Sequence, residues 1–154
     1  MADQVTVSRE IAAPPETLWA MVSDVTRMGE WSPENVGGEW LDGAAGPTSG
    51  SRFRGTNSNG KKTWKTVATV TDCVPGKEFA FKINAGGMSI AEWRYQFEPA
   101  AGGCRVTETW TDHRGGVVKM LGRVISGVAD RATHNRAGME QTLERLAAKA
   151  ESAN

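Results

Sequence analysis

Tryptophan and other large apolar residues alternate with polar residues along much of the middle of this 154-residue chain. In the clearest stretch, residues 90–98, single polar residues separate Trp93, Tyr95 and Phe97. Because successive side chains of a β-strand point to opposite faces, this spacing predicts a strand with one aromatic face and one polar face. A sheet built from such strands needs a cover over its aromatic face, and this requirement constrains the fold more than any other feature.

The same alternation recurs in short segments on both sides of residues 90–98, separated by clusters of glycine, proline and asparagine that are typical of turns. Turns as short as Asn59-Gly60 and Gly86-Gly87 join neighbouring strands into antiparallel hairpins, because a parallel connection needs about a dozen residues. With a first strand over residues 5–11, the pattern predicts seven antiparallel strands. The other six predicted strands span residues 36–42, 51–58, 63–74, 78–84, 88–98 and 104–112.

Two short helices are predicted between the first and second strands. Pro15 and Glu16 suit a first helical turn, where a missing N–H is harmless and a negative charge is stabilised. Asp24 can accept a hydrogen bond at the start of a second helix over residues 25–30. Both helices are short, so the C-terminal part of the chain has to supply the cover for the sheet.

The chain after Gly115-Gly116 has the pattern of a long amphipathic helix. Gly122, Gly127 and Gly138 lower its helix propensity, so it forms either two helices or one bent helix. We expect the part over residues 129–149 to pack into the sheet. Asn135 interrupts the apolar stripe, which otherwise consists of Val117, Leu121, Val124, Ile125, Val128, Ala132, Met139, Leu143, Leu146 and Ala150.

One helix across a wide, curved sheet leaves space between the two layers. A space lined by aromatic side chains and a few polar groups is a small-molecule pocket, and we expect a cavity of about 300–1,000 Å³. Its expected ligand-binding residues are inward-facing strand residues, one residue of the apolar stripe and one tryptophan after the second short helix. They are Trp31, Phe53, Asn57, Trp64, Phe81, Trp93, Tyr95, Glu108, Trp110 and Asn135.

Glu108 is the most informative acid, because strand parity places it beside Val106 and Trp110 on the inward face. A carboxyl group in apolar surroundings, without a cation, has a raised pKa and suits general acid–base catalysis. The alternative is a structural acid held by a buried arginine, an indole N–H or a backbone donor. Both interpretations stay open, and Tyr95 is the second candidate for proton transfer.

The other polar candidates also have structural alternatives. Asn57 either orients a ligand carbonyl or satisfies backbone groups at a strand end. Asn135 needs a polar partner, which is protein, water or ligand. His113 is expected to be exposed, and His134 should point elsewhere because it lies about 100° around the helix from Asn135.

Composition excludes several classes of protein. Lys plus Arg equals Asp plus Glu at 18 each, which argues against nucleic-acid binding. No apolar run approaches the length of a membrane span, so we expect no stable membrane insertion. Cys73 and Cys104 lack metal-site spacing and are expected to be free thiols. We therefore expect a cytoplasmic protein with one domain over residues 1–154, no metal or other cofactor, and a monomeric or homodimeric state.

The order of the predicted elements resembles the helix-grip fold of the START and birch-pollen-allergen superfamily. Five segments are similar to bacterial members of its polyketide cyclase/dehydrase and lipid-transport family. They are residues 24–34, 52–57, 93–98, 103–110 and 135–139, the last followed by Leu143 and Leu146. The resemblance implies an α+β fold in which a seven-stranded curved antiparallel sheet wraps around a long C-terminal helix, with two short helices after strand 1. It leaves the chemistry open, because the family includes cyclases and lipid carriers.

Two functions fit these expectations. The first is binding or transport of a hydrophobic, aromatic or polycyclic small molecule that Asn57, Glu108 and Asn135 orient, with access between the C-terminal helix and residues 31–36. The second is a cyclase or dehydratase-type enzyme in which Glu108 or Tyr95 moves a proton at a carbon next to a carbonyl. The scarcity of other inward titratable groups favours binding. A third possibility is a stress or regulatory protein that acts through its surface.

Overall fold

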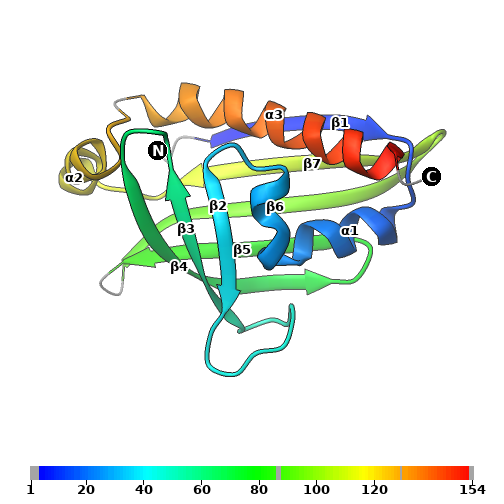
Figure 1. Ribbon diagram of the computed structural model, residues 1–154, viewed down its shortest axis with the longest axis horizontal. Coiled ribbons are helices and arrows are strands. Elements are labelled where there is room, and N and C mark those ends of the chain that lie inside the picture. The colour runs from blue at the N-terminus through cyan, green and yellow to red at the C-terminus, as the bar shows by residue number, and fades with distance from the viewer. Residues whose placement is uncertain (1–3, 86–87, 129, 153–154) are drawn as a thin grey trace.

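Seven antiparallel strands form one curved sheet in the computed structural model, which describes residues 4–85, 88–128 and 130–152 (Figure 1). The strand order is β1-β7-β6-β5-β4-β3-β2, so the first and last strands of the chain are neighbours. The bounds are β1 (Gln4–Ile11), β2 (Asn35–Trp40), β3 (Arg52–Ser58), β4 (Thr63–Val74), β5 (Glu78–Ala85), β6 (Met88–Ala100) and β7 (Gly103–Asp112). Every predicted strand ends within two residues of these bounds. The predicted Gly86-Gly87 turn lies outside the described residues.

Irregular pairing bends this sheet. The pairing of β4 with β5 shifts at Thr71 of β4, and the pairing of β5 with β6 shifts at Ile90 of β6. Such bulges insert unpaired residues into one strand and increase its local twist. The turn predicted at Asn59-Gly60 is also present between β3 and β4. Gly60 has a φ of 91° there, a conformation that favours glycine. The bulges help to curve the sheet, so that its concave face can receive a helix.

The two short helices after β1 form as expected. Helix α1 (Pro15–Ser23) has proline in its first turn, and the 3₁₀ helix η1 (Val25–Glu30) follows at once. The Asp24 side chain accepts a hydrogen bond from the Thr26 backbone N–H at 3.2 Å, which caps η1. Helix η1 packs closely on β2, because a Cβ atom at Gly38 would lie 2.5 Å from the Val25 carbonyl oxygen. Glycine at this position therefore permits the contact.

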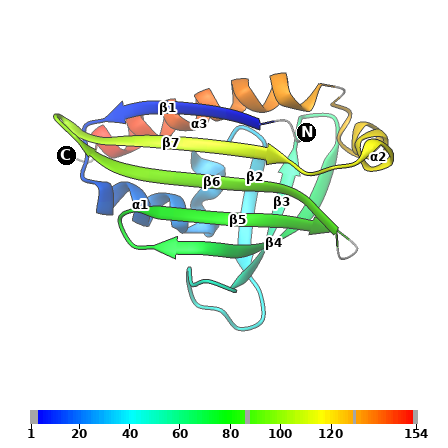
Figure 2. The same ribbon diagram turned by 180° about the vertical axis from the view of Figure 1, so that it is seen from behind.

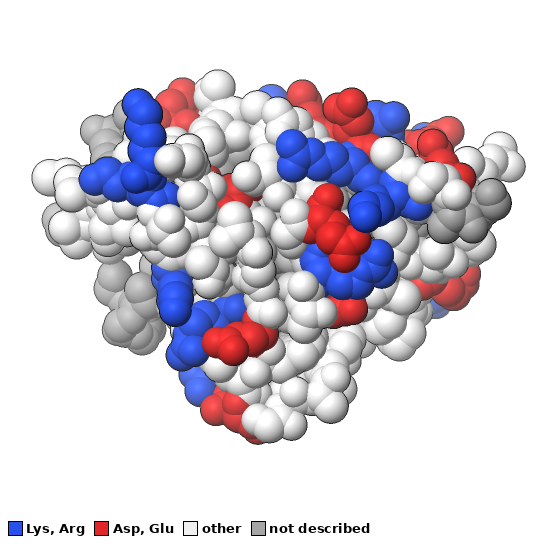
Figure 3. All heavy atoms as spheres, viewed as in Figure 1, with Lys and Arg blue, Asp and Glu red and all other residues white. Residues whose placement is uncertain are grey.

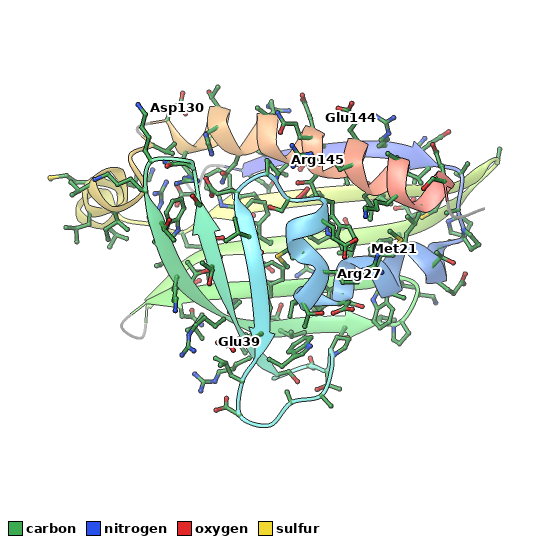
Figure 4. All side chains as sticks on the ribbon, in the orientation of Figure 1. Met21, Arg27, Glu39, Asp130, Glu144 and Arg145 are labelled. Atoms are coloured by element: carbon green, nitrogen blue, oxygen red, sulfur yellow. The ribbon has the colours of Figure 1, made fainter. Side chains whose placement is uncertain are left out.

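The core lies where α1 and the C-terminal half of α3 (Arg131–Ser152) meet the sheet. Helices α1, η1 and α3 lie on the same side of the sheet (Figures 1 and 2). Leu143 and Leu146 of α3 are buried in one cluster with Leu18 and Val106, and Met139 is buried in a second cluster. Glu144 and Arg145 are exposed on α3 (Figure 4). The expected burial of Met139, Leu143 and Leu146 is confirmed, and the arrangement is the helix-grip α+β fold.

The prediction of one continuous apolar stripe from Val117 to Ala150 is wrong for its first segment. The chain forms two helices, α2 (Gly116–Ser126) and α3, because the backbone turns at Gly127, where φ is 74°. Leu121, Val124 and Ile125 are more than half exposed, although their spacing continues that of the buried face of α3. Ala129, the first residue of the helix expected over residues 129–149, lies outside the described residues. No helix in the described ranges has the length and apolar character that crossing a membrane requires.

The two cysteines are free, as expected from their positions in different strands. Cys104 is buried in the core of β7, and Cys73 is half-buried on β4. The Cys73 thiol lies 3.4 Å from the Pro47 carbonyl oxygen. Cross-linking therefore does not contribute to the stability of the fold.

We predict that Leu143→Ala lowers the free energy of unfolding by about 2–5 kcal/mol, because it leaves a cavity in a packed region. Glu144→Ala, the adjacent exposed position, is the control and should change the same quantity by about 0.5 kcal/mol or less. Urea denaturation followed by circular dichroism measures both. Equal effects of the two substitutions would contradict the packing of α3 on the sheet.

Candidate functional site

A cavity of about 1120 Å³ lies between the sheet and the first half of α3, and α2 borders it. This volume is slightly above the expected range, and on the side of α2 the cavity is bordered by the partly exposed residues Leu121 and Ile125. The cavity wall includes nine of the ten residues predicted to bind the ligand. They are Phe53, Asn57, Trp64, Phe81, Trp93, Tyr95, Glu108, Trp110 and Asn135.

Cross-strand pairing brings the aromatic residues of the wall together. Trp93 on β6 pairs with Phe81 on β5 and with Trp110 on β7, which forms a row across three strands. The indole rings of Trp93 and Trp110 lie 6.4 Å apart, centroid to centroid. Phe53 and Phe81 make an edge-to-face contact at 5.0 Å. Aromatic rings in such contacts form a rigid apolar wall.

Trp31 is the predicted lining residue that does not border the cavity in the described structure. It follows η1 directly, it is 1% exposed, and it belongs to the core cluster. The Arg27 guanidinium lies 5.3 Å from the centre of its ring. Because η1 packs against β2, the residue that ends it points into the core under the helix. The alternation of inward and outward side chains holds only within strands. Trp31 does not lie in a strand, so this alternation could not predict where its side chain points.

Glu108 occupies the next cross-strand row, and no cation faces it along that row. Its paired residues are Tyr95 on β6 and Val7 on β1. The Tyr95 hydroxyl donates a hydrogen bond to Oε2 of Glu108 at 2.9 Å, while Oε1 is buried and has no hydrogen-bond partner among the described residues. Burial raises the pKa of Glu108 to about 8, although the hydrogen bond from Tyr95 opposes this shift. Glu108 is therefore largely a neutral acid at pH 7.

Tyr95 and Glu108 form one hydrogen-bonded pair in which the Tyr95 hydroxyl contacts Oε2 of Glu108. Burial raises the pKa of Tyr95 well above 10, and the neighbouring Glu108 raises it further. Tyr95 thus stays a hydrogen-bond donor across the accessible pH range. The pair can hold a proton on Glu108 and release it as the pH rises through about 8.

Asn57 is held within the sheet by its neighbours. Its amide nitrogen donates to the Thr66 hydroxyl at 3.1 Å, and its amide oxygen accepts from the Asn35 side chain at 3.5 Å. Asn35 is itself buried and accepts a hydrogen bond from the Gly37 backbone N–H at 2.9 Å. These bonds support the structural interpretation of Asn57, although the residue also borders the cavity.

A polar cluster at the edge of the cavity joins α3 to the segment before β2. Arg131 donates to both carboxylate oxygens of Glu34, at 2.8 and 3.0 Å, and to the Asn135 amide oxygen at 3.3 Å. The expectation for His134 is wrong, because its Nε2 lies 2.8 Å from Glu34 and the residue borders the cavity. The Arg131 guanidinium also lies 5.7 Å from the Trp64 ring centre. Asn135 therefore has a protein partner.

Sequence reasoning missed Glu34, Arg131 and Arg114 in the cavity wall. Arg131, His134 and Asn135 have helical i, i+3, i+4 spacing, which signals that they are neighbours on one helix. No local pattern indicates Glu34, which is 97 residues from Arg131. The carboxylate of Asp112 is buried and binds Arg114, which lowers its pKa although burial opposes the shift.

No group of three or more His, Cys, Asp or Glu side chains suited to a metal ion lies within the described ranges. The polar side chains of the cavity wall carry hydroxyl, amide, carboxyl, imidazole, guanidinium and, at Lys65, ammonium groups. They suit hydrogen bonding to a small organic molecule inside an apolar enclosure.

Comparison with known proteins gives a consistent set of similarities. The family described as "Polyketide cyclase / dehydrase and lipid transport" matches residues 2–151. The Polyketide_cyc-like protein Cgl2372 from Corynebacterium glutamicum is 30% identical, with a TM-score of 0.65 over 96% of this chain and 90% of that chain. Among the curated proteins none matches significantly.

Two further solved structures share the fold at lower sequence identity. CV1439 from Chromobacterium violaceum is 16% identical, with a TM-score of 0.72 over 97% of this chain and 98% of that chain. The di-domain ARO/CYC StfQ from the steffimycin biosynthetic pathway is 14% identical, with a TM-score of 0.75 over 99% of this chain and 52% of that chain. These two similarities concern the fold alone.

We predict that Glu108 destabilises the folded protein as the pH rises. Its pKa is about 8 in the folded protein and about 4.5 when solvated, so folding favours the protonated form. Its stabilising contribution is complete below pH 4.5 and is lost between about pH 4.5 and 8, at about 1.4 kcal/mol per pH unit. Glu108→Gln, which cannot ionise, should remove this part of the pH dependence of the unfolding free energy. Identical pH profiles for the two proteins, or an NMR titration that places Glu108 below pH 4, would contradict the prediction.

Proposed function

The chain belongs to the polyketide cyclase/dehydrase and lipid transport family, and on this premise we propose that it binds a hydrophobic, aromatic or polycyclic small molecule in its cavity. Hydrophobic ligand binding is what the family and the helix-grip fold imply. The observation that carries the finer proposal is the aromatic wall of a cavity of about 1120 Å³. A packed core would fill this space with aliphatic side chains, whereas the wall has three tryptophans, a tyrosine and two phenylalanines.

The binding energy of such a ligand would come mainly from desolvation. Each Å² of apolar surface that leaves water contributes about 25 cal/mol, and flat aromatic rings add stacking and edge contacts. The rings of Trp93, Trp110 and Phe81 are fixed by strand pairing, so they lose little freedom when a ligand binds. This rigidity favours a flat, fused-ring ligand over a flexible chain.

We propose that the ligand enters beside the polar cluster of Glu34, Arg131 and His134. This cluster bridges α3 and residues 32–36, and His134 is exposed while Glu34 is half-buried. Its hydrogen bonds connect α3 to the loop across the edge of the cavity. Breaking them would let α3 and the loop move apart without disturbing the buried leucines of α3.

A second candidate function is proton transfer in a cyclase or dehydratase-type enzyme. The Glu108–Tyr95 pair supports it, because an acid with a pKa of about 8 can both donate and accept a proton near neutral pH. The fold of StfQ, a di-domain ARO/CYC from a biosynthetic pathway, is compatible with this chemistry. The ionised form of Glu108 would remove a proton from a carbon next to a carbonyl, and the Tyr95 hydroxyl would hydrogen-bond to the carboxylate.

We predict that prodan, a neutral naphthalene ketone, binds in the cavity and quenches tryptophan fluorescence by energy transfer. Trp93→Ala should weaken its binding by about 1–3 kcal/mol, because the substitution removes one aromatic face of the wall. Trp40→Ala is the matched control, since Trp40 is also half-buried but does not border the cavity. Fluorescence titration gives the dissociation constants. Absence of saturable binding, or equal weakening by both substitutions, would refute the cavity as the binding site.

The natural ligand can be identified by native mass spectrometry of the protein purified from its own host. A co-purified mass that is lost on unfolding gives the molecule directly. The proposal expects a largely apolar, ring-containing compound. A purely ionic compound would contradict it.

For the enzymatic alternative, we predict that the protein accelerates deuterium exchange at the methylene next to the prodan carbonyl in heavy water. Ionised Glu108 would take the proton and return a deuteron, so the exchange rate should rise with pH up to about 8. Glu108→Gln should abolish the acceleration while prodan still binds, and Tyr95→Phe should shift its pH profile. The exchange is followed by proton NMR. Bound prodan that exchanges no faster than free prodan leaves binding as the function.

A further inference from the structure

Helix α2 exposes large apolar side chains at one end of the molecule. Met120, Leu121, Val124 and Ile125 are 61%, 55%, 67% and 55% exposed. Apolar groups that gather in one exposed patch mark a surface that contacts another molecule or a membrane. In contrast, the large hydrophobic residues of α3, Met139, Leu143 and Leu146, are buried.

The apolar side chains of α2 that the structure describes divide into two sets. Val118, Leu121 and Ile125 border the cavity, whereas Met120 and Val124 do not. Helix α2 therefore forms part of the cavity rim and presents further apolar side chains to solvent. The exposed surface of α2 is continuous with the opening of the cavity through Leu121 and Ile125.

Basic residues lie beside this apolar surface. Lys61 and Lys62 are exposed in the loop that joins β3 to β4, and a Cβ atom at Gly127 would lie 3.6 Å from Cγ of Lys62. The loop therefore touches the end of α2. Within the described ranges neither lysine forms an ion pair, and the sequence of α2 contains no Asp or Glu. Figure 3 shows an uncharged surface over α2 with Lys and Arg atoms next to it.

We propose that α2 and the β3–β4 loop dock on the surface of an anionic lipid bilayer. A helix with exposed apolar residues and neighbouring lysines matches the interface of such a membrane, where apolar groups enter the headgroup region and lysines pair with anionic lipids. A twofold dimer through α2 is less favourable, because it would bring the lysines of both copies to one interface. Docking in this way is peripheral, and the described helices remain outside the bilayer core.

Docking through α2 would place the cavity opening against lipid. A hydrophobic ligand could then pass between the bilayer and the cavity without crossing water. This transfer step rests on the proposed function, whereas docking itself depends only on the outer surface of α2 and on the lysines. An experiment can therefore refute ligand transfer without refuting membrane docking, and the reverse.

The test is sedimentation of the full-length protein with vesicles of equal parts phosphatidylglycerol and phosphatidylcholine, compared with vesicles of phosphatidylcholine alone. We expect binding to the anionic vesicles that weakens as NaCl rises from about 0.05 to 0.5 M. Met120→Ser/Val124→Ser should reduce the partition coefficient about tenfold or more, because it removes two apolar side chains from the docking surface. These positions do not border the cavity, so prodan binding should be unchanged.

Two further variants make the test specific. Val74→Ser is the matched control, because Val74 is 45% exposed at the opposite end of β4, roughly 35 Å from the loop. It should bind vesicles as the unmodified protein does. Lys61→Ala/Lys62→Ala should weaken anionic vesicle binding about tenfold and remove most of its salt dependence.

Three results would overturn docking through α2. They are no binding to anionic vesicles at low salt, equal loss in the α2 and Val74 variants, and a concentration-dependent dimer that Met120→Ser/Val124→Ser abolishes in the absence of vesicle binding. If the α2 variant unfolds by circular dichroism, the lysine variant decides the question alone. Vesicle binding by a protein that does not bind prodan would refute the proposed cavity function and leave docking intact.

Discussion

One long helix packs along a seven-stranded sheet, and two short helices cover the same face at one end only. This arrangement determines where the protein is packed and where it has a cavity. The C-terminal half of α3 contributes Leu143 and Leu146, which close against α1 and the strands. The first half contributes Met139 to a smaller cluster, while its Asn135 and Gly138 are too small or too polar to fill the space over the concave face. Apolar burial therefore stabilises one end of the molecule, and the other end is free to receive a ligand.

The buried Glu108 works against the stability that this packing provides. A carboxyl group among Val106, Trp110 and Tyr95 loses its hydration, and one hydrogen bond from Tyr95 replaces only part of it. An apolar residue of similar size would avoid this penalty. The rule that buried positions are apolar or fully hydrogen-bonded is broken most often at functional sites, where a strained or poorly solvated group is useful. Glu108 and its unpaired oxygen are the clearest such violation in the described structure.

The strands and most of the cavity wall could be predicted from sequence because both follow from strand parity. Once Trp93 and Tyr95 point inward, pairing with β7 places Trp110 and Glu108 on the same face. Trp31 was placed wrongly because it follows a 3₁₀ helix, where parity carries no information. The ion pair of Glu34 and Arg131 depends on a contact between residues 97 apart, which no local pattern specifies. The exposure of α2 was also missed, because its apolar spacing matches that of α3 until the turn at Gly127 separates them.

That turn also ends the continuous backbone hydrogen bonding between the two C-terminal helices, α2 and α3. Helix α2 lies between the Gly115-Gly116 pair, whose second residue begins it, and Gly127, and none of its side chains that the structure describes belongs to either core cluster. A segment with so few buried contacts opens with a much smaller free energy than the whole protein. Its amide hydrogens should therefore exchange through local opening, while those of β6 and β7 await global unfolding. The side of the cavity that α2 borders would then open at a rate set by an eleven-residue helix, independently of how stable the rest of the fold is.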